Sequence, residues 1–437
     1  MRCNIYILLS LLIIFSCKNN EETDELCCPT DDQEIADVPN VLLIITDDMG
    51  LDATPGYNIG TLKPNMPNLQ NLTNSGIKFN NVWSSPTCSP TRATILTGKY
   101  GYRTGVLEAG HNLSTQEISL QTYINNNTGN QYANAVIGKW HLGPASQPSH
   151  PNDMGIDFFS GMTQSGVDSY YNWSHTENGQ VSSSNEYATT KLTDEAIEWI
   201  NNQSQPWFLW LAYNAPHSPY HLPPNDLHYQ GGLADDQASI NANRLPYYLA
   251  AIEAVDTEMG RLFSSINTES LNNTIIIFIG DNGTPGPVVQ QYHSQRAKGS
   301  LYKGGINVPM IISGKGVERI NDQENALIST VDLFATIGQL CGIDTQQIHD
   351  SNSFVDLLNI SGNSRTHLYS EKGNNYYTVR NQTHKYMSFE DGSEALFNLE
   401  QNPFEMPNLL SQNQLPLSDN DQENLSDLIN IVNQIRD

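Results

Sequence analysis

Residues 88–92 read Cys-Ser-Pro-Thr-Arg, so a thiol, two hydroxyls and a cation share one short segment. Pro90 fixes its own φ angle and disfavours the helical region for Ser89, which predicts a helix that opens near Thr91, just after Cys88. The amino end of a helix presents unpaired N–H groups, so this position suits chemistry on an anion. The alternative is a buried cysteine at a helix start, the more frequent role of a single cysteine.

Two polar pairs follow two apolar runs of the sequence. These pairs are Asp47-Asp48 and Asp281-Asn282. Three carboxylates and one amide oxygen are ligands that Ca²⁺ or Mg²⁺ prefers, and a divalent ion would relieve the repulsion between buried carboxylates. Such residues are also common in the turns that end strands, and that is the alternative for either pair alone. Two such pairs in one chain favour a metal site.

Basic residues lie in three further short segments. Lys139 and His141 belong to the sequence Gly-Lys-Trp-His-Leu-Gly, and on an extended chain residues two apart project to the same side. His217 lies in Ala-Pro-His-Ser-Pro, and His221 is close enough to compete for its role. Lys298 lies in Arg-Ala-Lys-Gly-Ser. Lysines can neutralise an anion, and histidines can carry protons near neutral pH.

The elements that must position these residues can be read from the hydrophobic pattern. Four runs without alternation predict buried strands, at residues 40–46, 133–137, 207–213 and 274–280. Apolar residues at spacings of three and four predict helices at 191–201 and 246–266. Short strands at 376–380 and 385–389 and a closing helix at 421–435 follow. The sequence therefore predicts an α/β fold: a large mixed, mostly parallel sheet flanked by helices, with a smaller C-terminal antiparallel sheet lobe.

These motifs, in this order, resemble the formylglycine-dependent (type I) sulfatases of the alkaline phosphatase superfamily. The resemblance covers roughly residues 38 to 410 and includes Leu-Phe-Asn-Leu at 396–399 with Asn-Pro-Phe-Glu at 402–405. It implies that Cys88 is converted to formylglycine and that one cation, Ca²⁺ or Mg²⁺, is bound. It also implies the roles of the site residues. The catalytic residues would be Cys88, Arg92, Lys139, His141, His217 and Lys298, and the metal ligands would be Asp47, Asp48, residue 88, Asp281 and Asn282.

Two positions depart from the pattern of that family. Thr91 stands where Ser is more frequent, and it keeps the hydroxyl. Lys303 stands where a Glu commonly precedes the Gly-Gly pair. Lys303 would either bring a second cation near the site or alter a loop contact, and the sequence leaves both open.

The resemblance implies a sulfuric ester hydrolase. The expected export of the chain and its acidic charge indicate a sulfated carbohydrate as the substrate, such as an environmental or algal polysaccharide or its oligosaccharides. The alternatives are a phosphate or phosphonate ester hydrolase of the same superfamily and a lipid-anchored, glycan-binding pseudo-sulfatase. A formylglycine-generating maturation enzyme is then a required partner. Acidic residues outnumber basic ones 47 to 21, for a formal charge of −26, which argues against a nucleic-acid partner.

The first residues indicate export. Arg2 precedes an apolar run too short to span a bilayer, and Ser16-Cys17 resembles the end of a bacterial lipobox. We expect a lipoprotein-type signal peptide at 1–16, a flexible tether at 17–37, a catalytic domain at 38–350 and a smaller α+β subdomain at 351–437. The membrane contact would be only the lipid on Cys17, at the outer membrane or cell surface. Without it, the protein would be periplasmic or secreted.

Overall fold

The two apolar runs that precede the polar pairs form neighbouring strands. In the computed structural model, which describes residues 38–437, β1 (Asn40–Thr46) is buried along its whole length. It pairs in parallel with β8 (Trp207–Tyr213) on one side and β9 (Thr274–Gly280) on the other. Because these strands are covered on both faces, their sequences show no polar alternation.

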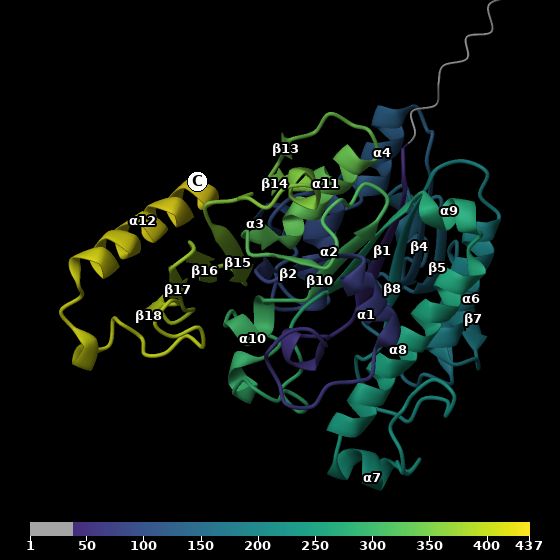
Figure 1. Cartoon of the computed structure of the whole chain (residues 1–437), viewed down its shortest axis with the longest axis horizontal. Coiled ribbons are helices and arrows are strands. Elements are labelled where there is room, and N and C mark those ends of the chain that lie inside the picture. The colour runs from purple at the N-terminus through teal and green to yellow at the C-terminus, as the bar shows by residue number, and fades with distance from the viewer. Residues whose placement is uncertain (1–37) are drawn as a thin grey trace, which may run out of the picture. The chain divides into compact units, whose positions relative to one another are not determined.

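The strands belong to a ten-stranded sheet of order β11-β2-β10-β9-β1-β8-β4-β5-β6-β7 (Figure 1). The central strands from β9 to β5 run parallel, and the neighbours β10 and β6 pair with them in antiparallel orientation. This confirms the predicted mixed, mostly parallel sheet. The other strands are β2 (Gly76–Phe79), β4 (Ala133–Lys139), β5 (Phe158–Met162), β6 (Trp173–Glu177), β7 (Gln180–Ser184), β10 (Met310–Gly314) and β11 (Asp322–Glu324).

Helices cover both faces of this sheet. Leu42 and Ile44 of β1 pack in one apolar cluster, with residues of α1 (Pro67–Asn74), α6 (Ala188–Asn201) and α8 (Leu245–Ser265). Leu43 and Ile45 pack in another, with residues of α2 (Cys88–Thr97), α4 (Leu120–Thr128) and α11 (Leu333–Leu340). The alternation along β1 follows from the period of two in a strand. The predicted helices at 191–201 and 246–266 are confirmed as parts of α6 and α8.

The start of α2 differs from the prediction. The helix begins at Cys88 itself, after an extended Thr87 (φ −143°, ψ 165°), and not near Thr91. Pro90 lies in the first turn, where a missing N–H costs no helical hydrogen bond. The rule against a helical residue before proline is therefore overridden at Ser89. Gly98 ends the helix in the left-handed conformation (φ 67°).

The C-terminal part forms a separate antiparallel sheet, as predicted. It contains β15 (Leu368–Lys372), β16 (Tyr376–Arg380), β17 (His384–Ser388) and β18 (Glu394–Asn398), in that order. The closing helix α12 (Asp419–Arg436) buries Leu428 and Val432 against this sheet. Lys385 connects the sheet to the larger body, because its ammonium donates to Leu301 O (2.6 Å) and Glu405 Oε1 (2.5 Å).

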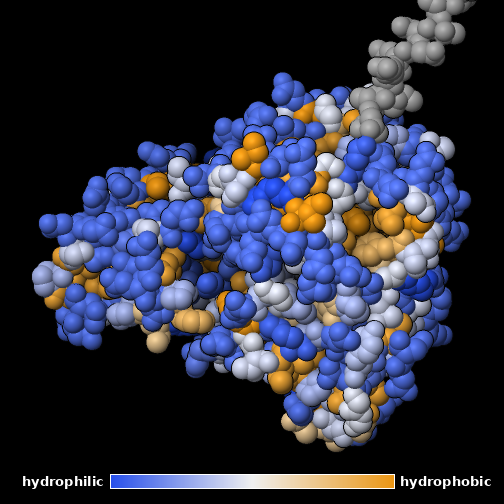
Figure 2. Space-filling model, viewed as in Figure 1, coloured by the Kyte–Doolittle hydropathy of each residue, from blue (hydrophilic) through white to orange (hydrophobic). Residues whose placement is uncertain are grey.

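Residues 37–437 form one compact unit, so the boundary at 350/351 stays a prediction. The signal peptide, Cys17 and the tether lie outside the described residues. Within residues 38–437, no helix combines the length and the apolar character that crossing a membrane requires. The face of the molecule that Figure 2 shows is mostly hydrophilic, with several groups of apolar residues among the hydrophilic ones.

Candidate active site

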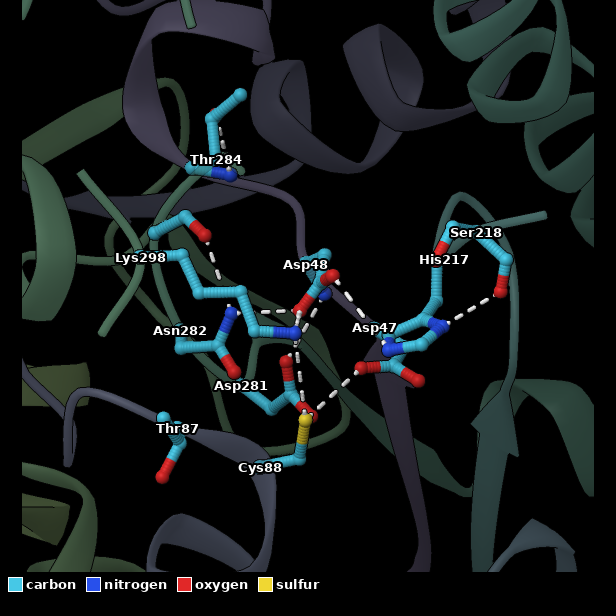
Figure 3. A network of polar contacts seen from close by, with 12 residues as sticks. Asp47, Asp48, Thr87, Cys88, His217, Ser218, Asp281, Asn282, Thr284 and Lys298 are labelled. Atoms are coloured by element: carbon cyan, nitrogen blue, oxygen red, sulfur yellow. Dashed lines mark hydrogen bonds and ion pairs between the residues drawn. The ribbon is translucent and has the colours of Figure 1, made fainter. Parts of the chain in front are cut away.

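The predicted site residues meet at the carboxyl edge of the sheet. Asp47 and Asp48 follow β1, and Asp281 and Asn282 follow β9, so the two pairs come from adjacent parallel strands. The backbone N–H of Asp48 donates to Asp281 Oδ1 at 3.0 Å, and Asn282 Nδ2 donates to Asp48 Oδ1 at 2.8 Å. Cys88, the first residue of α2, points at them (Figure 3). The acids that the sequence places 233 residues apart are thus in direct contact.

Each of the three carboxylates in this cluster, Asp47, Asp48 and Asp281, has its own cation. Arg92 pairs with Asp281 (NH2 to Oδ2, 2.8 Å), Lys139 pairs with Asp47 (Nζ to Oδ2, 2.5 Å), and Lys298 pairs with Asp48. Such pairing is needed because an unpaired buried charge is costly. Burial opposes ionisation of Asp47, but Lys139, His217 and Arg92 outweigh it and hold the pKa of Asp47 below its usual range. Burial, together with the charge of Asp47, raises the pKa of Asp281.

Cys88 lies among these charges and is only 1% exposed. Its thiol donates to Asp47 Oδ1 at 3.4 Å, and Lys298 Nζ lies 3.7 Å from Sγ. Burial, and then the charge of Asp47, raise the pKa of the thiol above its usual range. The thiolate is the nucleophilic form of cysteine, so the arrangement disfavours chemistry by Cys88 as a thiol.

His141 and His217 both lie near this cluster. Burial, together with Lys139 and Arg92, lowers the pKa of His141 to about 2, so its ring is neutral. His217 Nε2 lies 3.8 Å from Asp48 Oδ2, while its Nδ1 lies 2.7 Å from Ser218 O. The expectation of an extended chain through His141 is wrong, because this residue is left-handed (φ 57°) and turns the chain after β4.

His221, the competitor of His217, has another role in the structure. Its ring stacks on Tyr170 with 3.8 Å between centroids, and its Nε2 lies 3.0 Å from the Tyr187 hydroxyl. It therefore packs a loop, and His217 is the histidine beside the acids.

The oxygen ligands fit a hard cation. Ligand atoms of Asp47, Asp48, Cys88 and His217 all lie within 4.8 Å of one another. Asn282 Oδ1 is buried and has no hydrogen-bond partner among the described residues, which is unusual for a polar atom in a protein interior. The two carboxylates and the unsatisfied amide oxygen suit a hard cation such as Ca²⁺ or Mg²⁺, whereas a thiol and an imidazole are ligands that zinc also accepts; Asp281, a predicted ligand, is not in this group.

A cavity of about 430 Å³ leads to this cluster. Asp48, His217 and Lys298 belong both to its lining and to the network of polar contacts drawn in Figure 3. The other lining residues are Ser218, Pro219, Tyr220, Gln237, Ile240, Asn241, Arg244, Pro285 and Pro287. No sequence motif pointed to the lining residues from α7 (Gln237–Ala242) or to Arg244, which immediately precedes α8.

Two other cavities lie elsewhere. A cavity of about 930 Å³ is lined by residues around Asn40 and Trp207, at the opposite ends of the strands, and contains none of the predicted site residues. Lys303 lines a third cavity, of about 160 Å³, with Arg380, Lys385 and Glu405. The backbone N–H of Lys303 donates to Glu405, so its position in the structure is that of a loop contact.

Comparison with known proteins agrees with this arrangement. The family model "Sulfatase" matches residues 39–343. The uncharacterized sulfatase YdeN of Escherichia coli (strain K12) is 28% identical over 68% of this chain, which spans 61% of that protein's length. The ulvan-active sulfatase of Formosa agariphila is 24% identical, covering 92% of this chain and 83% of its own.

Among solved structures, Ps i-CgsB in complex with k-i-k-neocarrahexaose has the same fold. Its TM-score is 0.76 at 22% identity, with 91% of this chain and 92% of that chain covered. The family match spans more than half of the sequence and contains every residue of the cluster described above. The chain therefore belongs to the sulfatase family.

Proposed function

We propose that this protein is a sulfuric ester hydrolase that removes sulfate from a sulfated carbohydrate. The observation that carries the proposal is the set of paired charges around Cys88, of which Asp48 and Lys298 line an open cavity. One relative named as an ulvan-active sulfatase, and a neighbour solved with a neocarrahexaose, support a glycan substrate.

The chemistry follows from the position of each residue. Oxidised to formylglycine, residue 88 would supply a hydrated aldehyde, whose hydroxyl is the nucleophile and whose second hydroxyl allows sulfate to leave. Asp47, Asp48, Asp281, Asn282 and residue 88 would hold Ca²⁺ or Mg²⁺, which supplies charge stabilisation at the reacting oxygens.

The cations and histidines complete the reaction. Lys139 and Lys298 already lie beside Asp47, Asp48 and Cys88, so they can neutralise sulfate oxygens there, and Arg92 fixes Asp281. His217 lines the cavity and protonates the departing alcohol. We assign to His141 the proton of the second hydroxyl, because its buried Nδ1 has no hydrogen-bond partner among the described residues and can accept one.

The central experiment measures sulfate release across a panel of sulfated oligosaccharides, together with an aryl sulfate and an aryl phosphate. We expect turnover of sulfate esters, none by Cys88→Ala, and a residue-88 peptide with the mass of an aldehyde in place of the thiol. Active enzyme with an unmodified thiol contradicts the mechanism. Preference for the phosphate supports the phosphoryl alternative, and binding without release supports the pseudo-sulfatase.

A second experiment isolates the role of His217. We expect His217→Gln to lower kcat on a sugar sulfate by about 10²–10⁴-fold, because an alkoxide leaves poorly without a proton. The loss on 4-nitrophenyl sulfate should be much smaller, since that phenolate leaves unaided. Equal losses on both substrates would show that His217 does not act as the general acid.

The proposal extends to the cell. We infer export as a lipoprotein, with Cys17 lipidated and residues 17–37 as a tether, ahead of a catalytic domain at 38–350 and a subdomain at 351–437. The Cys17→Ser variant should then move from the membrane fraction to the soluble fraction. A formylglycine-generating enzyme must be present in any expression host.

A further inference from the structure

Arg244 brings an unpaired positive charge to the catalytic cavity. It immediately precedes α8 and lines the cavity that contains His217 and Lys298. Its guanidinium has no hydrogen-bond or ion-pair partner within residues 38–437. Among the other described arginines, those that pair with carboxylates are Arg92, Arg103, Arg261, Arg319, Arg365 and Arg436. Arg296 and Arg380 donate to backbone carbonyls instead, so Arg244 is the one described arginine whose guanidinium has neither kind of partner.

The cavity as a whole favours negative charge. Asp48 is the only acidic residue in its lining, and Lys298 already pairs with it. Arg244 therefore remains uncompensated, and low-dielectric walls strengthen its field on a bound group.

Tyr220 shares the cavity lining with Lys298 and Arg244. Burial and Asp48 raise the pKa of its hydroxyl to about 12, and Lys298 and Arg244 oppose this rise, so the phenol lies within electrostatic reach of both cations. Its ring packs edge-to-face on Tyr248 at 6.4 Å, which fixes its orientation.

The remaining lining suits a sugar. Pro219, Ile240, Pro285 and Pro287 offer apolar surface to a ring face, and the amides of Gln237 and Asn241 can bond hydroxyls. The volume of about 430 Å³ is that of a small-ligand site.

We propose that Arg244 is a specificity-determining residue that binds a second anionic group, a carboxylate or a sulfate, on the sugar that carries the scissile ester or on its neighbour. The inference rests on the proposed sulfatase function and narrows its substrates to multiply anionic glycans. A guanidinium forms two parallel hydrogen bonds with either group, so the two sources share one recognition chemistry.

The test uses three oligosaccharides with the same sulfate ester, taken from the panel above. The neighbouring position carries a neutral sugar, a uronic acid or a second sulfate. We expect Arg244→Gln to lower kcat/KM on the anionic substrates by about 10- to 100-fold, mainly through KM. The neutral substrate should change by less than about twofold, and Arg244→Lys should restore part of the loss. An effect on only one of the two anionic substrates shows whether Arg244 binds the carboxylate or the second sulfate.

Arg103→Gln is the matched control. It removes the same charge from an exposed residue outside the cavity and should not change the preference among the three substrates. Equal losses on all three substrates with Arg244→Gln, or no loss, would overturn the inference, as would the same pattern in Arg103→Gln.

A binding measurement separates this inference from the proposed function. The Cys88→Ala variant cannot form the aldehyde, because alanine has neither a thiol nor a hydroxyl to oxidise, so calorimetry in the presence of Ca²⁺ reports binding of the three oligosaccharides without turnover. Weaker binding of the anionic ones after Arg244→Gln supports the inference even if the wild-type protein releases no sulfate. Unchanged binding contradicts it even if sulfate is released.

Discussion

At the scale of single residues, Arg92 connects three segments that meet only in the folded chain. Its guanidinium, carried by α2, donates to Lys139 O at the end of β4 (2.7 Å) and to Asp281 after β9 (2.8 Å). We expect Arg92→Gln to lower the free energy of unfolding by about 3–5 kcal/mol, because the charge of Asp281 loses its partner inside the protein. Urea denaturation measures this loss.

The control for that experiment is Arg103→Gln, which removes a partly exposed pair with Asp350. It should cost no more than about 1 kcal/mol, the usual range for a surface ion pair. Equal losses in the free energy of unfolding for the two variants would show that the buried Arg92–Asp281 pair stabilises the fold no more than the exposed pair does.

His221 gives a pH dependence of stability. Burial lowers its pKa from 6.5 to about 4. The unfolded chain therefore binds more protons at this residue between pH 6.5 and 4, so its contribution is full above pH 6.5 and is lost as the pH falls through that window. His221→Gln should flatten the fall in stability by up to about 3 kcal/mol, measured by denaturation at several pH values. An unchanged pH profile would contradict the assignment.

At the scale of elements, α12 depends on a small contact with the C-terminal sheet. Leu428 is fully buried against Val379, Tyr386 and Leu396. We expect Leu428→Ala to cost about 2–4 kcal/mol and to speed hydrogen exchange throughout α12. Ile360→Ala, at a residue 75% exposed, should change stability by less than about 0.5 kcal/mol. Unaltered exchange in α12 would mean that the helix is held by other contacts.

The elements also show which patterns in the sequence are informative. The strands β1, β8 and β9 were predicted with their observed bounds, because buried parallel strands must be apolar throughout. The start of α2 was predicted three residues too late, since the preference of a residue before proline is weaker than the packing of that turn. Helix α7 was not predicted, because it is short and buries only Ile240.

At the scale of the whole molecule, the metal site should couple to global stability. Binding of Ca²⁺ to the native state alone adds about 2.7 kcal/mol at 100 times its Kd, so the Tm should rise with Ca²⁺ and fall with a chelator. Asp48→Asn should weaken this response, whereas Asp344→Asn, the same charge change at an exposed residue, should leave it intact. Identical responses of the two variants would exclude Asp48 as a ligand.

The arrangement of the whole molecule determines how much of the site could be predicted from the sequence. Residues at strand ends, such as Asp47 and Asp281, could be grouped because parallel strands end at one edge. Arg244 could not, because its place in the cavity depends on how α7 and α8 fold over that edge. Lys303 could not be decided either, since its contact, Glu405, is 102 residues away.

The burial of Cys88 has a consequence for the order in which the chain is oxidised and folds. Its thiol is 1% exposed, and Asp48, His217 and Lys298 line the cavity that leads toward it. If residue 88 must be oxidised by another enzyme, that enzyme can reach it only before the segment around residue 88 has folded. Oxidation must therefore precede folding. The specific activity of a preparation would then depend on the rate at which residue 88 is oxidised relative to the rate at which the chain folds. Slower folding would raise the fraction of molecules that carry the oxidised residue, with no change in the cavity itself.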